Sequence, residues 1–97
     1  MIRFTGTEED FRRLAPQGLV LYNDYCGGII FYYNGKFRWI SATRNPQGLL
    51  PFRPNTYRFI QELSGAWSYL QRPEYRAHLY VLVPPKALYT RTLHART

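Results

Sequence analysis

The dipeptide Asn34-Gly35 stands between two runs of apolar and aromatic residues, at positions 28–33 and 36–42. Asparagine followed by glycine is the preferred pair for a two-residue type I′ turn, because both central positions of that turn need a positive φ. The pattern predicts a β-hairpin whose two-residue loop sets Tyr33 opposite Lys36. This hairpin constrains the fold most, since it assigns every side chain of both strands to one of two faces.

The two faces of the predicted hairpin differ in character, because opposed side chains share a face and successive pairs alternate. We expect the wholly apolar and aromatic face to be the core, and the mixed face to be open to solvent or to a partner. The first face consists of Ile30, Tyr32, Phe37 and Trp39. The mixed face consists of Ile29, Phe31, Tyr33, Lys36, Arg38 and Ile40.

One helix is predicted before the hairpin in the sequence, and a second one after it. Thr7 is a good N-cap, three acids follow it at positions 8–10, and two arginines precede Pro16, an order that complements the helix dipole. A second helix is predicted from about Thr56 to Gln71, where apolar residues recur at helical spacing. Those residues are Phe59, Ile60, Leu63, Ala66, Trp67 and Leu70.

Three further strands are predicted at residues 1–5, 19–22 and 79–83, the last a nearly continuous apolar run typical of a central strand. The resulting order is β-α-β-β-β-α-β. It predicts one small α+β domain over residues 1–85, with a mainly antiparallel sheet of four or five strands and two helices packed on one face. Residues 86–97 contain no acid and are predicted to form either an edge strand or a basic tail.

Charge is unevenly distributed along the 97 residues, which carry 13 Lys and Arg against 6 Asp and Glu, a net charge of +7. Three of the acids belong to the first helix cap, and none occurs between Asp24 and Glu62. Cations that cluster beside aromatic side chains are typical of nucleic-acid binding. The cations of this acid-free stretch are Lys36, Arg38, Arg44, Arg53 and Arg58.

These features predict a small, non-enzymatic binding protein that contacts nucleic acid, either RNA or DNA, or an acidic or nucleic-acid-bound protein complex. The five cations would meet phosphates, and Phe31 and Tyr33 would stack on bases or position them. The connection at residues 43–55 would complete the surface. The alternative without a ligand is a solvated sheet face whose arginine stems cover aromatic surface.

A protein partner is a second interpretation, because tyrosine and arginine are enriched at interface hot spots. The connection at residues 43–55 also offers an apolar anchor, formed by Leu49, Leu50 and Phe52. The chain would then be a small inhibitor or adaptor that binds a host protein, as compact phage proteins do. The same three residues could instead close the end of the core.

Patterns for metal binding and catalysis are weak. Cys26 is the one cysteine, and together with His78 and His94 it shows no paired-ligand spacing, so we expect no metal and no cofactor. We expect His78, which directly precedes a strand, to be a hydrogen-bonded structural residue rather than a general base. No signal peptide or bilayer-length apolar run is visible, which predicts a cytoplasmic protein.

In size and charge the chain resembles the small RelE-type toxins that cleave RNA, whose helices generally precede the main sheet. That resemblance implies a third function, a ribonuclease that uses Arg and Tyr side chains together with His78 or His94. The order of a helix, three strands and a helix over residues 7–71 is similar to that of double-stranded-RNA-binding domains. Their second helix opens with a lysine cluster, whereas residues 56–59 here hold one cation, Arg58.

Overall fold

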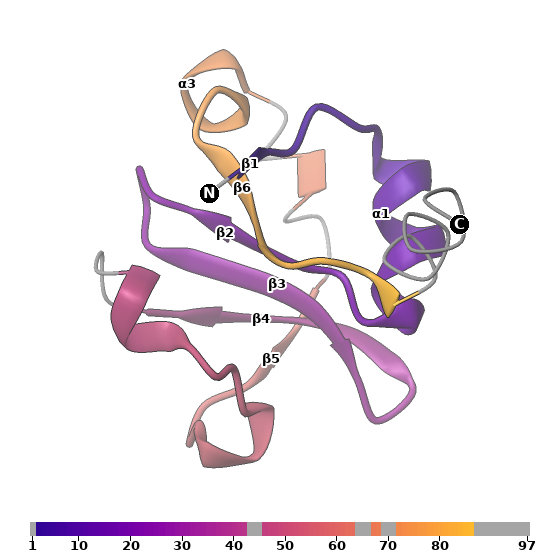
Figure 1. The fold of residues 1–97 in the computed structure, drawn as a ribbon, viewed down its shortest axis with the longest axis vertical. Coiled ribbons are helices and arrows are strands. Elements are labelled where there is room, and N and C mark those ends of the chain that lie inside the picture. Colours follow the sequence, from indigo (N-terminus) through magenta and orange to yellow (C-terminus); the bar gives the residue numbers. More distant parts are fainter. Residues whose placement is uncertain (1, 43–45, 64–66, 69–71, 87–97) are drawn as a thin grey trace, which may run out of the picture.

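The structure is a computed structural model that describes residues 2–42, 46–63, 67–68 and 72–86. Within these residues one antiparallel sheet of six strands forms the centre of the molecule, in the order β1-β6-β2-β3-β4-β5 (Figure 1). The strands are β1 (Ile2–Arg3), β2 (Val20–Asn23), β3 (Gly28–Tyr33), β4 (Lys36–Ser41), β5 (Gln61–Glu62) and β6 (Leu79–Val83).

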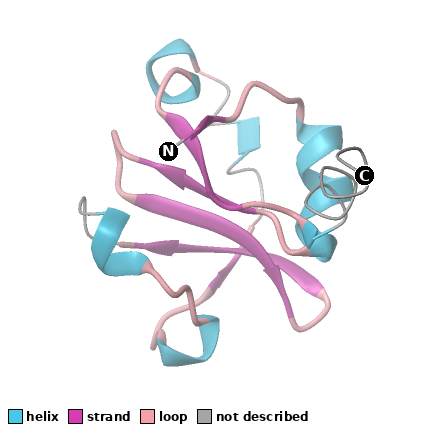
Figure 2. Cartoon of the chain, viewed as in Figure 1, coloured by secondary structure: helices cyan, strands magenta, loops and turns pink. Residues whose placement is uncertain are grey.

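Short helical elements surround the sheet (Figure 2). In the described part of the chain they are the α-helices α1 (Glu8–Leu14) and α3 (Pro73–Arg76), and the 3-10 helices η1 (Ala15–Gln17), η2 (Pro46–Leu49) and η3 (Pro54–Thr56). Residues 67–68 are helical as well. The fold is α+β, as predicted, and its order differs from the predicted one by the additional short strand β5. Strand β6 lies between β1 and β2, which confirms a central place for the apolar run at residues 79–83.

The β3–β4 hairpin has the register that the Asn34-Gly35 turn predicts. Tyr33 pairs with Lys36, and the ladder continues through five further pairs to Gly28 opposite Ser41. Asn34 and Gly35 both adopt positive φ, at 51° and 78°. The turn chemistry therefore sets the register, as expected for a type I′ turn.

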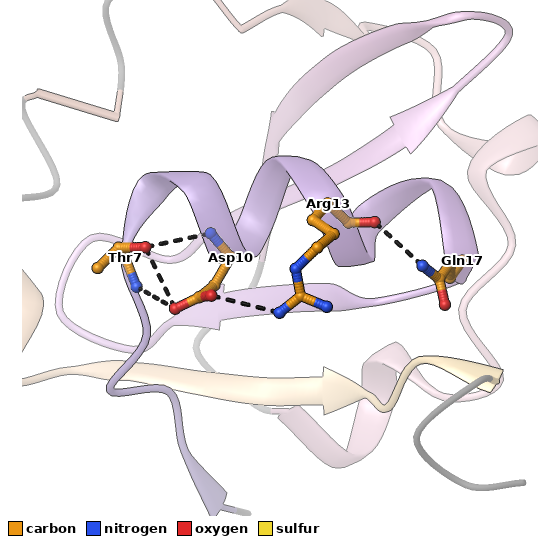
Figure 3. A network of polar contacts seen from close by, with 4 residues as sticks. All are labelled: Thr7, Asp10, Arg13 and Gln17. Carbon is orange, nitrogen blue, oxygen red and sulfur yellow. Dashed lines mark hydrogen bonds and ion pairs between the residues drawn. The ribbon is translucent and has the colours of Figure 1, made fainter. Parts of the chain in front are cut away.

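Helix α1 begins with a capping box, which Figure 3 shows in close view. The backbone N–H of Asp10 donates to Thr7 Oγ1 at 3.1 Å, and the backbone N–H of Thr7 donates to Asp10 Oδ2 at 2.9 Å. The hydrogen bond from the Thr7 backbone N–H, together with hydrogen bonds from the side chains of Arg13 and Thr7, lowers the pKa of the Asp10 carboxyl group. At the other end the helix gives way to η1 at Ala15, directly before Pro16. The predicted N-cap and helix end are thus both confirmed.

The face of the sheet under α1 holds one hydrophobic core. Phe11 of α1 is fully buried, and its ring lies 5.6 Å from that of Phe37 and 5.2 Å from that of Trp67. Tyr32 belongs to this face by register but is 37% exposed near the hairpin end. We call this cluster the α1-side core; its buried members are Phe4, Phe11, Ala15, Leu19, Leu21, Ile30, Leu63, Trp67 and Leu79.

The opposite face of the sheet is also covered, so the prediction of an open mixed face is wrong. Residues 46–60, which include η2 and η3 and which we call the cover segment, pack on it and lie across the strands from α1 (Figure 1). Because β3 is apolar on both faces, leaving either one in water would expose large apolar side chains. The buried members of this cover-side core are Val20, Tyr22, Ile29, Phe31, Ile40, Leu49 and Leu82.

The predicted second helix does not form over its first half, so that prediction is wrong for residues 56–63. The chain leaves η3 in an extended conformation at Tyr57 and forms β5, which pairs with β4. Ile60 packs against the cover-side core, whereas Leu63 belongs to the α1-side core. The chain therefore passes around the β4 edge from one face to the other, which an amphipathic helix with a single buried face cannot do.

Three parts of the prediction lie outside the described residues. These are residues 64–66 and 69–71 of the second helix, the connection at residues 43–45, and the basic tail or edge strand beyond Lys86. Residues 67–68, between the two gaps, are helical, and Trp67 is buried, as predicted. Across the ranges that are described, no helix is both long enough and apolar enough to cross a membrane.

Candidate nucleic-acid interface

The two aromatic residues predicted to stack on bases lie in the cover-side core. Phe31 is 1% exposed, and the ring of Phe52 from the cover segment packs against it at 5.0 Å. Tyr33 is half-buried against the same cluster, with its ring 6.4 Å from that of Phe31. Phe31 therefore cannot act as a stacking platform unless the cover segment moves away, and its predicted role at a surface is wrong.

The two cations of β4 interact with neighbouring groups of the same domain. Arg38 is half-buried, and its Nε donates to the backbone carbonyl oxygen of Tyr33 at 3.0 Å. Lys36 Nζ lies 3.5 Å from Glu62 Oε2, and both side chains are more than half exposed. A solvent-exposed ion pair of this kind contributes little to stability, so a phosphate can compete with Glu62 for Lys36.

The cover segment carries two more of the predicted cations, Arg53 and Arg58, and both are exposed. Arg53 precedes η3, and the backbone N–H and hydroxyl of Thr56 donate to its carbonyl oxygen at 3.1 and 2.7 Å. Among the described residues, no acidic side chain forms an ion pair with either arginine. The fifth predicted cation, Arg44, lies outside the described residues.

The predicted apolar anchor of the connection at residues 43–55 is divided between the core and the surface. Leu49 is 6% exposed and belongs to the cover-side core, and Phe52 packs partly against that core. Leu50 points outward and is 51% exposed. Two of the three residues thus close the core, as the alternative interpretation held, and one remains accessible to a partner.

Phe59 is a surface residue that the sequence analysis placed in the buried stripe of a helix. It is 76% exposed and directly follows the exposed Arg58. Helical spacing among the apolar residues pointed to the wrong face, because residues 57–60 are not helical. The acid-free composition of the segment was the signal that could have drawn attention to Phe59, since an exposed cation beside an exposed aromatic ring is a common feature of nucleic-acid surfaces.

A different cluster forms where the β2–β3 turn meets the start of β6. His78 Nδ1 lies 2.7 Å from Asp24 Oδ1, so His78 is hydrogen-bonded, as predicted. No local pattern in the sequence links His78 to Asp24, which is 54 positions away. Cys26 in the same turn is exposed, but no group of three or more His, Cys, Asp or Glu side chains able to hold a metal occurs in the described part of the chain. His94 lies outside that part.

Comparison of the chain with protein-family models, with curated proteins and with solved structures gave no match. The chemistry of these surface groups is therefore the basis for assigning a function.

Proposed function

We propose that this protein binds single-stranded nucleic acid through the outer surface of the cover segment and the neighbouring β4–β5 edge. The observation that carries the proposal is the pair Arg58-Phe59. A cation and a large aromatic ring are consecutive and both exposed, in a segment without acids. A phosphate and the adjacent base of a single strand need this combination of a charge and a flat apolar surface.

The cations of this surface would contact the phosphate backbone. Arg53 and Arg58 are exposed on the cover segment, and Lys36 is exposed at the edge beside β5. Arginine suits this role because its planar guanidinium donates several hydrogen bonds to phosphate oxygens at once. Glu62, the partner of Lys36, ends the acid-free stretch and would limit the surface on that side.

Phe59 would supply the stacking surface in place of the buried Phe31. A side chain that is 76% exposed gains little from the core of its own domain, so its apolar ring is available for a base. Stacking of a base on an aromatic side chain contributes about 1–3 kcal/mol by alanine substitution, and it tolerates any sequence because every base has a π face. The proposal therefore predicts binding with little sequence preference.

Salt dependence of binding tests the electrostatic part of the proposal. Fluorescence anisotropy with a labelled single-stranded oligonucleotide should give a slope of log K against log[salt] that becomes shallower by about 0.7 for each lost phosphate contact. Arg53→Ala and Arg58→Ala should each produce this change. Arg3→Ala is the matched control, because Arg3 is also exposed but lies in β1 at the opposite edge of the sheet.

Phe59→Ala tests the stacking part and should weaken binding by about 1–3 kcal/mol without changing the salt slope. Phe59→Trp should keep the affinity, since it preserves an aromatic face. Absence of binding, binding independent of salt, or an equal effect of Arg3→Ala would contradict the proposal.

A protein partner is the second candidate, and the exposed side chains of Leu50 and Phe59 favour it. Both belong to the cover segment, and exposed apolar residues surrounded by polar ones are typical of interface anchors. A pull-down with and without nuclease separates the two functions. A stoichiometric protein partner that survives nuclease treatment and is lost in Leu50→Ala would favour the protein partner over nucleic acid.

A further inference from the structure

Backbone hydrogen bonds hold Asp24 and His78 next to each other. Besides the contact of 2.7 Å between His78 Nδ1 and Asp24 Oδ1, the backbone N–H of Asp24 donates to the carbonyl oxygen of His78 at 3.2 Å. The neighbouring residues Asn23 and Leu79 pair in the β2–β6 ladder. The pairing of β2 with β6 therefore sets the proximity of the two side chains.

Asn23 secures the turn that carries Asp24. It is 1% exposed, and its Oδ1 accepts hydrogen bonds from the backbone N–H groups of Tyr25 and Cys26 at 2.9 and 3.1 Å. Its Nδ2 donates to the carbonyl oxygen of Tyr75 at 2.8 Å, which ties the turn to α3. A buried amide with both ends satisfied gives the turn one conformation and so pre-organises the pair.

The hydrogen bond to Asp24 determines which nitrogen of His78 can accept a proton. An ionised carboxylate only accepts hydrogen bonds, so the proton of a neutral imidazole must be on Nδ1. The lone pair is then on Nε2, to which no residue in the described part of the chain donates. The side chains of His78 and Asp24 are 42% and 39% exposed, so a ligand in solvent can reach them. A carboxylate that orients an imidazole in this way is the arrangement of a general base.

An aromatic platform stands beside this base. The ring of Tyr25 lies 5.4 Å from that of His78, and the residue is 50% exposed. The edge-to-face contact of Tyr25 with Tyr75, at 5.2 Å, holds it in place. A nucleobase stacked on Tyr25 would bring its ribose next to the imidazole.

We propose that Asp24, His78 and Tyr25 form a site that cleaves single-stranded RNA. The proposal rests on the proposed function, because RNA must first bind to this basic protein. RNA is the substrate class because its own 2′-hydroxyl is the nucleophile, so a single well-placed base is enough to start the reaction. Asp24 acts as a positioning residue and His78 as the general base.

The step is balanced without an oxidant or a co-reactant. His78 Nε2 takes the proton of the 2′-hydroxyl as that oxygen forms a bond to phosphorus. The bond between phosphorus and the 5′-oxygen breaks, and the leaving oxygen takes a proton from water. The products are a 2′,3′-cyclic phosphate on one fragment and a 5′-hydroxyl on the other.

The test incubates the full chain with a short single-stranded RNA and with its all-deoxy counterpart. The RNA should be cut to fragments with cyclic phosphate ends, and the deoxy strand should remain intact because it lacks the 2′-hydroxyl. His78→Ala should lower the cleavage rate by about 100-fold or more, within the range for loss of a general base. Added imidazole should restore part of that rate, a response that loss of a structural contact would not give.

Further variants assign the roles of the other two residues. Asp24→Asn should lower kcat while leaving KM nearly unchanged, and Tyr25→Phe should keep the activity that Tyr25→Ala loses. Cys26→Ser is the matched control in the same turn and should be fully active. Circular dichroism of each variant checks that the fold is intact.

Three outcomes overturn the proposal: no cleavage of RNA, cleavage of the deoxy strand at the same rate, or full activity in His78→Ala. The first outcome together with normal RNA affinity would leave the proposed binding function standing. Loss of both cleavage and binding would overturn both proposals.

Discussion

Replacing Leu49 by alanine tests whether the cover segment closes a second core. Leu49 is 6% exposed and packs into the cover-side core. Truncation of a buried leucine costs about 2–5 kcal/mol, since transfer energy is lost and a cavity remains. We expect about 3 kcal/mol here, which lowers the Tm of a domain of this size by about 12–24 °C. Its neighbour Leu50 is 51% exposed, so Leu50→Ala should cost about 0.5 kcal/mol or less.

Urea unfolding of the two variants, followed by tryptophan fluorescence and far-ultraviolet circular dichroism, measures this difference directly. The two substitutions remove the same atoms from adjacent positions, so their difference reports burial alone. Equal and small losses of stability in both variants would contradict the claim that the cover segment buries this face of the sheet, and would favour the open face that the hairpin pattern predicts.

Three further predictions concern the turns and the helix cap. Thr7→Ala should destabilise the protein by about 1 kcal/mol, measured by urea unfolding, because the N-terminal N–H groups of α1 lose their acceptor. Because the pKa of Asp10 is lowered on folding, its carboxylate stabilises the fold fully above the ordinary Asp pKa of the unfolded chain, and this contribution is lost as pH falls through the lowered pKa. Asp10→Asn removes the titrating group. The variant should therefore lose less Tm than the natural protein between about pH 5 and pH 2, the range in which Asp titrates. Gly27→Ala should lower the free energy of unfolding by about 2 kcal/mol or more, because φ is +73° and the new Cβ would lie 2.7 Å from the carbonyl oxygen of Ala42. Gly35→Ala is the control: φ is +78° but no atom lies within 4 Å of the new Cβ, so the loss in the same assay should be about 1 kcal/mol.

Local sequence signals predicted the elements whose stability is itself local. The Asn34-Gly35 turn determines the hairpin register through backbone φ, and the capping box of Thr7 and Asp10 determines where α1 begins. Both depend on residues within a few positions of one another. Such local signals do not depend on the tertiary contacts of the rest of the chain, and so these elements appear in the structure as predicted.

The first half of the predicted second helix, residues 56–63, does not form because tertiary packing outweighs the periodic spacing of apolar residues there. Ile60 and Leu63 are spaced as on one helical face, yet they enter the cores on opposite faces of the sheet. The run at residues 28–33 was the overlooked signal, because a strand that is apolar at nearly every position must be covered on both sides. A second cover had to come from the remaining chain, and residues 46–60 supply it.

In the candidate sites, too, some residues can be predicted from the sequence and others cannot. The acid-free composition of their segment marks Arg53 and Arg58 as candidates, whereas the exposure of Phe59 depends on a local conformation that helical spacing predicts wrongly. The pairing of Asp24 with His78 depends on β2 lying next to β6, a long-range contact that no local pattern encodes.

An NMR titration of the labelled protein with a short single-stranded DNA, which the proposed RNA-cleaving site leaves intact, locates the binding surface. If the cover segment and the β4–β5 edge bind the strand, the backbone amide shifts of residues 53–62 move on binding, while those of α1, on the other side of the sheet, stay in place. Shift changes confined to α1, or no change at a low salt concentration where electrostatic binding is strongest, would contradict the proposed function.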